Sequence, residues 1–138
     1  MTTEYNKPLP RPISVELTRP FWEAAKRHEL VMPRCTKCDH FFFYPREECP
    51  RCFSRDIEWA KVSGNGRLHT YTIVHQPASP AFQEDAPHVY AVVQLDEGPR
   101  MISNIVECEL DALQVDMPLV PAFDDVTPEW TLVKFKPA

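Results

Sequence analysis

Four cysteines in two closely spaced pairs constrain this chain more than any other feature. Two residues separate Cys35 from Cys38 and Cys49 from Cys52, and the segment between the pairs predicts a strand and a turn. Two thiolates at this spacing can bind one metal ion from a single turn, and two such turns supply the four tetrahedral ligands that Zn²⁺ accepts. The spacing therefore predicts one zinc ion held by all four cysteines. Since no ligand position stays open for water or substrate, we expect this zinc to be structural.

Other interpretations of the cysteines stay open. Two disulfides would also use four cysteines, but they require an oxidising compartment, and the polar N-terminal segment has no secretory signal. Four thiolates can instead bind iron, as in rubredoxin. His40 is an alternative ligand, although we expect it to be solvated. Cys108 is left over, and we interpret it as an inert thiol, because free cysteine behaves as a small hydrophobic residue.

The charge of the chain limits its function classes. Residues 1–62 carry 11 Lys+Arg and 9 Asp+Glu, a net of +2, whereas residues 63–138 carry 4 and 11, a net of −7, which together give −5. The acidic second half would repel a phosphate backbone, so we expect no nucleic-acid partner. No apolar run reaches the roughly 18 residues of a transmembrane helix. We therefore expect a cytoplasmic protein without a membrane partner.

The beginning of the chain predicts an extended arm and one short helix. Three prolines keep residues 1–17 extended. Thr18 is a suitable N-cap, and a helix is expected from Arg19 to about His28. Phe21 and Trp22 lie on or beside its apolar stripe, which packs against the rest of the chain or faces a partner.

The second half of the chain predicts a small β-barrel. Five segments have strand patterns, and they are residues 57–63 continuing through 66–76, 89–96, 100–107, 118–124 and 131–136. Ser63-Gly64-Asn65-Gly66 interrupts the first segment, where glycines indicate a bulge or a sharp bend. Five strands with a coiled first strand are typical of an OB-fold.

The predicted fold class is therefore mainly β, with a short N-terminal helix, a rubredoxin-like zinc ribbon and a five-stranded OB-fold barrel. We expect three parts: residues 1–30 as the arm and helix, 31–56 as the zinc ribbon, and 57–138 as the OB-fold domain. A structureless loop is expected at 77–88, and long loops of this kind are commonly functional.

No catalytic set of residues emerges from the sequence. The chain has three glycines and none of the motifs GxGxxG, P-loop, GxSxG or HExxH. His69, His75 and His88 fall near one end of the predicted barrel, but no serine or cysteine stands in clear relation to them. We assign no catalytic residue and expect no enzyme activity from this chain on its own.

An ordered set of motifs resembles a known family. The segments FWEAAKRHEL, CTKC, CPRC, SGNG, TYTIVHQ, QLDEG and MPLV follow one another over about residues 8–136. This order is similar to the zinc-ribbon/OB-fold proteins called domain of unknown function 35. The family favours glycine after each second cysteine and before Met-Pro, whereas this chain has Asp39, Phe53 and Asp116. We expect local distortions of these turns and intact metal ligation.

The resemblance implies an accessory role in lipid or steroid metabolism. Members of the family accompany thiolases, acyltransferases or side-chain aldolases that act on acyl-CoA, and the companion enzyme carries out the carbon–carbon chemistry. We expect this chain to form a hetero-oligomer with such an enzyme and to help line the acyl-CoA site. The expected partner contacts are Phe21, Trp22 and Phe42. The cations Arg34, Arg46, Arg51 and Lys61 either bind CoA phosphates or form a solvated charged face.

Two other function classes stay open. Zinc ribbons and OB-folds both occur in nucleic-acid-binding modules, although such a module needs a positive track along its groove. An independent enzyme or redox protein is the other class, and iron in the cysteine site would favour redox chemistry.

Overall fold

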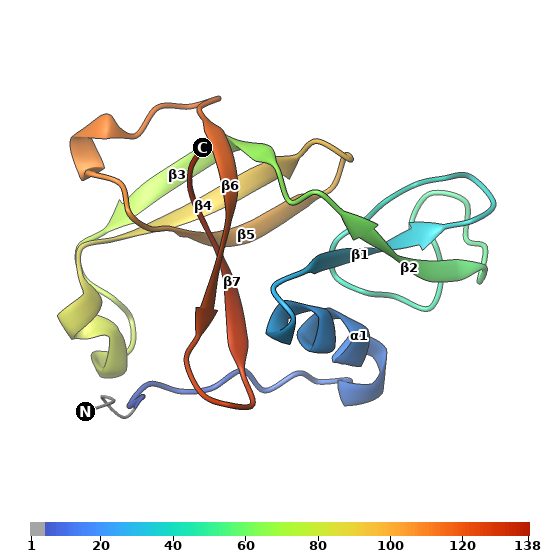
Figure 1. Cartoon of the computed structure of the whole chain (residues 1–138), viewed down its shortest axis with the longest axis horizontal. Coiled ribbons are helices and arrows are strands. Elements are labelled where there is room, and N and C mark those ends of the chain that lie inside the picture. Colours follow the sequence, from blue (N-terminus) through green and yellow to red (C-terminus); the bar gives the residue numbers. More distant parts are fainter. Residues whose placement is uncertain (1–4) are drawn as a thin grey trace.

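The structure is a computed structural model that describes residues 5–138 (Figure 1). The predicted arm begins in residues 1–4, which lie outside the described residues. The helical elements are α1 (Val15–Lys26) and the short 3-10 helices η1 (Pro80–Asp85) and η2 (Leu110–Ala112). The strands are β1 (Leu30–Cys35), β2 (Ile57–Val62), β3 (Gly66–Val74), β4 (His88–Leu95), β5 (Arg100–Ile105), β6 (Pro118–Asp125) and β7 (Thr131–Pro137).

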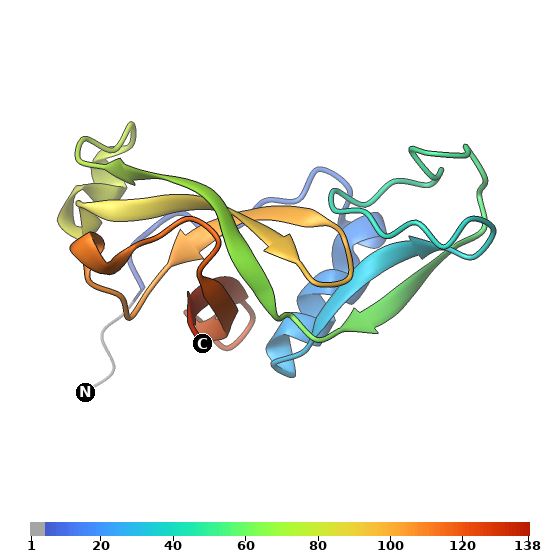
Figure 2. The same ribbon diagram turned by 90° about the horizontal axis from the view of Figure 1, so that it is seen from above.

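Strands β1 and β2 form the ribbon, which contains the four paired cysteines. They pair antiparallel from Leu30 opposite Val62 to Cys35 opposite Ile57. The expectation that residues 57–63 start the barrel is therefore wrong, because β2 belongs to this two-stranded sheet. The strand predicted between the cysteine pairs is reduced to one isolated bridge between Arg34 and Phe41. Figures 1 and 2 show the ribbon and the barrel side by side, joined by the segment after β2.

The remaining five strands form a closed barrel in the order β3-β4-β5-β7-β6. All neighbours pair antiparallel except β5 and β7, which pair in parallel through Ile105 and Phe135. Counted within the barrel, this order is 1-2-3-5-4, the Greek-key arrangement of an OB-fold. This barrel confirms the predicted fold class. The alternation of apolar residues also predicted the bounds of these five strands to within about two residues.

The barrel core consists of the inward-facing residues of alternating strands. On β4, Val89, Ala91, Val93 and Leu95 are all buried, whereas the residues between them are half-buried or exposed. Phe135 on β7 is fully buried. Full burial of a large apolar side chain stabilises the fold by about 1.5–3 kcal/mol relative to leaving it exposed. Residues of β1 and β2 join the same hydrophobic cluster, so the ribbon and the barrel share one core.

The link between the ribbon and the barrel requires glycine at two positions. Gly64 has a φ of 80°, and a Cβ atom there would lie 2.5 Å from Pro121 Cγ. A Cβ atom at Gly66 would lie 2.4 Å from the carbonyl oxygen of Gln94. The backbone N–H of Ser63 donates to Glu97 Oε2 at 2.8 Å. These contacts stabilise the bend that was predicted from the glycines. The bend connects the ribbon sheet to the barrel, however, and does not interrupt a barrel strand. We propose the linker 63–65 as the boundary between the ribbon and the OB-fold domain.

Helix α1 is longer at its beginning than expected. It starts at Val15 with Ser14 as the N-cap, so the predicted start at Arg19 is wrong. Pro20 lies inside the helix, where the missing N–H removes one hydrogen bond without ending the helix. The helix ends where His28 adopts a φ of 59° and the backbone N–H of Glu29 donates to the carbonyl oxygen of Ala24 at 2.9 Å.

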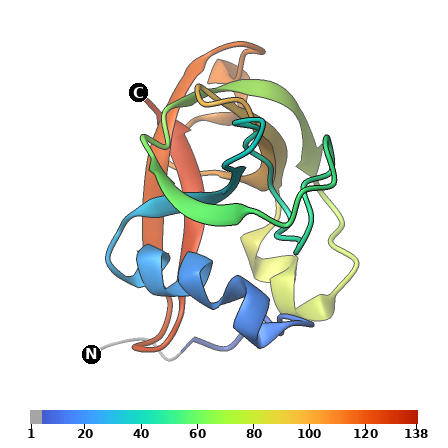
Figure 3. The same ribbon diagram turned by 90° about the vertical axis from the view of Figure 1, so that its right-hand side faces the viewer.

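Helix α1 packs against the ribbon and the hairpin of β6 and β7 (Figure 3). Ala24 and Ala25 are fully buried, and their small side chains allow close contact with β1. Trp22 packs edge to face on Trp130 in the β6–β7 turn, with ring centroids 5.0 Å apart. His28 Nε2 lies 2.9 Å from Asp125 Oδ2. The helix therefore connects the two parts of the molecule.

The loop at 77–88 contains structure that the sequence did not indicate. Residues 80–85 form η1, and Ser79 Oγ accepts a hydrogen bond from the N–H of Ala81 at 3.3 Å. The ammonium of Lys7 in the arm lies 3.5 Å from Asp85 in η1. The arm is thus held to this loop at one end. Among the described residues, no helix is long and apolar enough to cross a membrane.

Candidate metal centre and its surroundings

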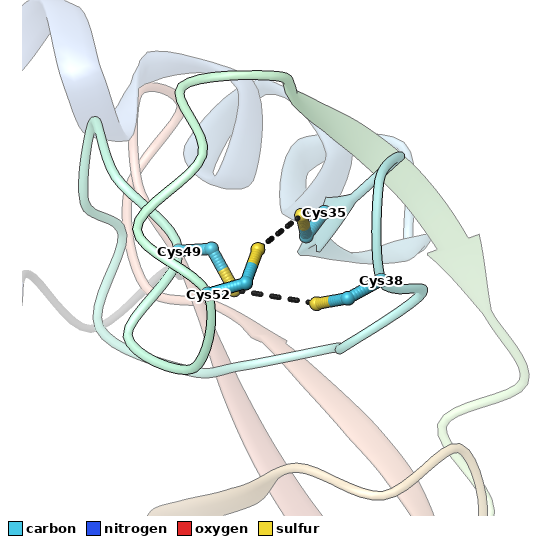
Figure 4. Close-up of side chains that lie close together, drawn as sticks. All are labelled: Cys35, Cys38, Cys49 and Cys52. Atoms are coloured by element: carbon cyan, nitrogen blue, oxygen red, sulfur yellow. Dashed lines mark hydrogen bonds between the residues drawn. The ribbon is translucent and has the colours of Figure 1, made fainter.

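The four paired cysteines meet at the end of the ribbon (Figure 4). Their sulfur atoms all lie within 4.8 Å of one another. Cys35 Sγ is 3.5 Å from Cys52 Sγ, and Cys38 Sγ is 3.7 Å from Cys49 Sγ. A tetrahedral zinc–thiolate site with Zn–S bonds of about 2.3 Å has sulfur–sulfur edges of about 3.8 Å, whereas a disulfide bond measures about 2.05 Å. The donor set and its spacing fit a zinc ion, and the disulfide alternative is not supported.

The two cysteine turns have the same backbone conformation. The N–H of Asp39 donates to the carbonyl oxygen of Cys35 at 2.8 Å, and the N–H of Phe53 donates to that of Cys49 at 2.9 Å. Asp39 has a φ of 61° and Phe53 a φ of 63°. These left-handed conformations explain the glycine preference of the family at both positions. The expected distortion is not seen, because both non-glycine residues adopt the conformation that the turn needs.

Backbone N–H groups in the turns stabilise thiolates at the first cysteine of each pair. Burial raises the pKa of Cys49, but N–H groups of Cys52 and Arg51 donate to its sulfur and lower the pKa to about 7. The pKa of Cys35 is likewise lowered, because the N–H groups of Cys38 and Lys37 outweigh the effect of burial. Both lowered pKa values favour the deprotonated form that a metal ligand requires.

The second cysteine of the first turn behaves differently. The N–H of His40 donates to Cys38 and lowers its pKa, but burial and the neighbouring sulfurs outweigh this bond and raise the pKa to about 12. His40 directs its ring elsewhere, stacked on Phe42 with centroids 6.1 Å apart, and it is absent from the group of possible metal ligands among the described residues. The structure therefore favours cysteine over His40 as the fourth ligand.

The four cations proposed for CoA binding fall into two groups. Arg34 pairs with Asp39 and also with Glu58 at 2.7 Å, and Lys61 pairs with Glu29 at 3.7 Å. Arg46 and Arg51 form no ion pair with any residue of the described range 5–138. Of these four cations, Arg46 and Arg51 are therefore the two whose charge no carboxylate of residues 5–138 neutralises.

The aromatic residues expected at a partner interface differ in how far they are buried. Phe42 is only 5% exposed, so its assignment as a partner contact is wrong: its side chain is part of the interior. Phe21 and Trp22 are half-buried. Two exposed aromatic residues of the ribbon were missed, Tyr44 at 57% exposure and Phe53 at 73%. Both have positive φ, and the signal for Phe53 was its place at a position where the family favours glycine.

An apolar cavity of about 350 Å³ lies between the arm, α1 and the ribbon, and we call it the aromatic groove. Its lining residues include Pro10, Pro12, Phe21, Trp22, Tyr44 and Trp59. A second cavity of about 350 Å³ adjoins it, since both are lined by Pro33, Pro45 and Trp59. The second cavity is also lined by Arg46 and Arg55. The sequence placed no groove here, because its walls come from separate segments.

The remaining candidate residues stay apart from the metal centre. His88 pairs in register with Val74, so His75 and His88 share one end of the barrel, while His69 lies farther along β3. Cys108 is half-buried at the edge of the core, and its thiol donates to the carbonyl oxygen of Glu109 at 3.4 Å. This placement agrees with the interpretation of Cys108 as a packing residue.

The two-stranded ribbon with four clustered cysteines and the closed five-stranded barrel together define a zinc-ribbon/OB-fold protein. Residues 22–58 match the rubredoxin-like zinc ribbon domain of ChsH2, and residues 59–124 match its C-terminal OB-fold domain. A DUF35 domain-containing scaffold protein of Methanothermobacter thermautotrophicus is 36% identical over 101 residues, which cover 72% of this chain and 75% of that protein. The chain belongs to the DUF35 family.

Two further relatives cover nearly all of this chain. The probable enoyl-CoA hydratase alpha subunit of Thermomonospora curvata is 38% identical over 130 residues. These residues are 94% of this chain but only 40% of that relative, which is much longer. A solved chain of the Ltp2-ChsH2(DUF35) aldolase superimposes with a TM-score of 0.81 at 35% identity, covering 92% of this chain and 98% of that chain.

Proposed function

We propose that this chain is a non-catalytic accessory subunit that binds and supports a thiolase-like enzyme acting on acyl-CoA. The likeness to the chain in the Ltp2-ChsH2(DUF35) aldolase carries the proposal, because it extends over 92% of this chain. A relative's name as an enoyl-CoA hydratase alpha subunit supports an acyl-CoA substrate. In this proposal the companion enzyme, an aldolase or another thiolase-like protein, makes or breaks the carbon–carbon bond.

One zinc ion bound by Cys35, Cys38, Cys49 and Cys52 is part of the proposal. Four cysteine ligands leave no position for a substrate, so the ion supplies structural cross-linking and no chemical step. Structural zinc contributes about 10–16 kcal/mol of apparent binding free energy in small domains. Thiolate ligands persist in a reducing compartment, which supports the cytoplasm as the location.

The partner surface in this proposal includes the aromatic residues that are accessible. Phe21 and Trp22 line the aromatic groove and are half-buried, while Tyr44 and Phe53 are exposed at 57% and 73%. Aromatic side chains are enriched among the residues that dominate binding energy at interfaces. Arg46 and Arg51 are the proposed CoA-facing cations, since Arg34 and Lys61 already have carboxylate partners.

Co-expression with an Ltp2-type aldolase from the same source tests the proposal. We expect the two chains to elute together in size-exclusion chromatography with light scattering, with about one zinc per accessory chain. The accessory chain alone should not turn over acyl-CoA, and the aldolase should gain activity or solubility in the complex. Salt-sensitive binding to a single-stranded oligonucleotide, without binding to the aldolase, would instead favour a nucleic-acid module.

A further inference from the structure

Two sequence motifs that the proposed function does not use lie in contact at the junction of the ribbon and the barrel. The first is SGNG at residues 63–66, which contains the linker. The second is QLDEG at residues 94–98, which spans the end of β4 and the β4–β5 turn. A Cβ atom at Gly66 would lie 2.4 Å from the carbonyl oxygen of Gln94, so only glycine allows this contact. The two motifs therefore fit closely against each other, although they are far apart in the chain.

Glu97 is the residue of the turn whose side chain bonds to the linker. Its Oε2 atom accepts a hydrogen bond from the backbone N–H of Ser63 at 2.8 Å, and the backbone N–H of Asp96 donates to the carbonyl oxygen of Asn65 at 3.0 Å. Within residues 5–138, no other side chain outside the linker hydrogen-bonds to residues 63–65. A hydrogen bond to a carboxylate is roughly twice as strong as one between neutral groups. Glu97 therefore makes the strongest polar contact between the linker and the barrel.

The second oxygen of Glu97 indicates that this contact is not kept for stability alone. Oε1 is buried and has no hydrogen-bond partner in the part of the chain that the structure describes. A buried carboxylate oxygen without a partner destabilises the folded chain, and this cost offsets the bond that Oε2 forms. Positions where such a local rule is broken are commonly functional. Glu97 therefore contributes direction at the junction more than it contributes stability.

The other contacts at the junction do not by themselves fix the orientation of the ribbon. Residues of β1 and β2 join the barrel core, but apolar packing is non-directional. Helix α1 contacts the hairpin of β6 and β7 through Trp22, which packs on Trp130. Figures 1 and 3 show α1 and the β4–β5 turn on opposite sides of the junction. Contacts on both sides restrain a tilt that either one alone would allow, so the Glu97 contact completes the restraint.

We propose that Glu97 is a positioning residue that sets the orientation of the ribbon relative to the barrel, and that the companion enzyme binds both parts in this one orientation. The inference rests on the proposed accessory function, and it adds what the linker and turn motifs do in that function. An interface that spans two parts of a chain binds more tightly when their geometry is fixed before binding.

Residual dipolar couplings of the full zinc-loaded chain measure this orientation. The amide couplings of β1 and β2 and those of β3–β7 are each fitted to an alignment tensor, and the wild type should need one common tensor. Glu97→Ala removes the acceptor of the Ser63 N–H, so we expect its ribbon couplings to require a second tensor. Barrel couplings that keep their wild-type values show that the variant folds. A single tensor for both parts of Glu97→Ala would overturn the proposal.

Two variants of the same turn serve as matched controls. Asp96→Ala removes the neighbouring carboxylate, which is exposed, and leaves the backbone bond from residue 96 to Asn65 in place. Glu97→Gln keeps a side-chain oxygen as the acceptor for the Ser63 N–H. We expect one common tensor in both controls, as in the wild type. A second tensor in either control would refute the assignment of this role to the Glu97 acceptor.

Titration of each variant with an Ltp2-type aldolase tests the link to assembly. Glu97→Ala should weaken the complex at least about tenfold and retain about one zinc per chain, whereas both controls should stay within about twofold of the wild type. A changed orientation with wild-type affinity would overturn this link. Failure of the wild type itself to bind the aldolase would refute the proposed function instead, and the couplings would still decide whether Glu97 sets the orientation.

Discussion

Replacement of Phe53 by glycine should stabilise this protein, which is unusual for the removal of an aromatic side chain. Phe53 has a φ of 63°, a conformation that costs a non-glycine residue roughly 1–2 kcal/mol. Its side chain is 73% exposed, so its removal sacrifices little packing. Glycine has greater conformational freedom in the unfolded chain, which reduces the gain in stability by about 0.5–1 kcal/mol. The balance predicts a gain of about 0.5–1 kcal/mol in the free energy of unfolding for Phe53→Gly.

Two control variants isolate the backbone effect. Phe53→Ala removes the same ring but keeps a Cβ atom in the left-handed conformation, so its free energy of unfolding should stay within about 0.5 kcal/mol of the wild type. Asp39→Gly relieves the equivalent conformation in the first turn but also breaks the ion pair with Arg34, and we expect a smaller gain. Urea unfolding at fixed free zinc measures all three variants. Phe53→Gly no more stable than Phe53→Ala would refute the reasoning.

Phe53→Gly also tests whether the Phe53 ring contacts the partner enzyme. A strained and exposed phenylalanine is unfavourable in the isolated chain, which suggests that its ring is retained for a contact outside the chain. We therefore expect Phe53→Gly to weaken the complex with the aldolase by at least about 1 kcal/mol while it stabilises the free subunit. Titration of the labelled subunit with the aldolase measures this change. Wild-type affinity in Phe53→Gly would place the interface elsewhere.

Three further predictions concern the metal, the helix and pH. Cys49→Ser should lose zinc and unfold the ribbon, because structural zinc contributes about 10–16 kcal/mol; an unchanged melting curve in the metal-free variant would contradict this. Trp22→Ala should weaken the aldolase complex by at least about 1 kcal/mol with zinc retained, as checked by metal analysis and titration. A hydrogen bond from Thr131, and to a smaller extent one from His28, lowers the pKa of Asp125 in the folded protein. These bonds therefore stabilise the fold at pH values above the pKa of Asp in the unfolded chain, about 3.9, and this stabilisation is lost as the pH falls from there through the lowered pKa. Thermal melts of Asp125→Asn should therefore show a smaller acid-induced drop than the wild type.

The sequence by itself was sufficient to predict the features that depend on residues close together in the chain. The spacing of Cys35, Cys38, Cys49 and Cys52 placed four sulfurs in one site, because a two-residue gap sets the geometry of each turn locally. Alternation of apolar residues identified the five barrel strands, since a strand that is buried on one face must repeat every two residues. Glycines at the linker predicted the bend at 63–66.

Only the tertiary structure decided which surfaces face one another. Residues 57–62 pair with β1 and not with the barrel, because the partner of a strand depends on the path of the whole chain. Phe42 is buried while Phe53 is exposed, although both follow a cysteine turn, since burial depends on which distant residues pack over each ring. The aromatic groove likewise exists only where the arm, α1 and the ribbon come together. Local sequence patterns contain the periodicity of an element, whereas the walls of a site are long-range contacts that no short pattern encodes.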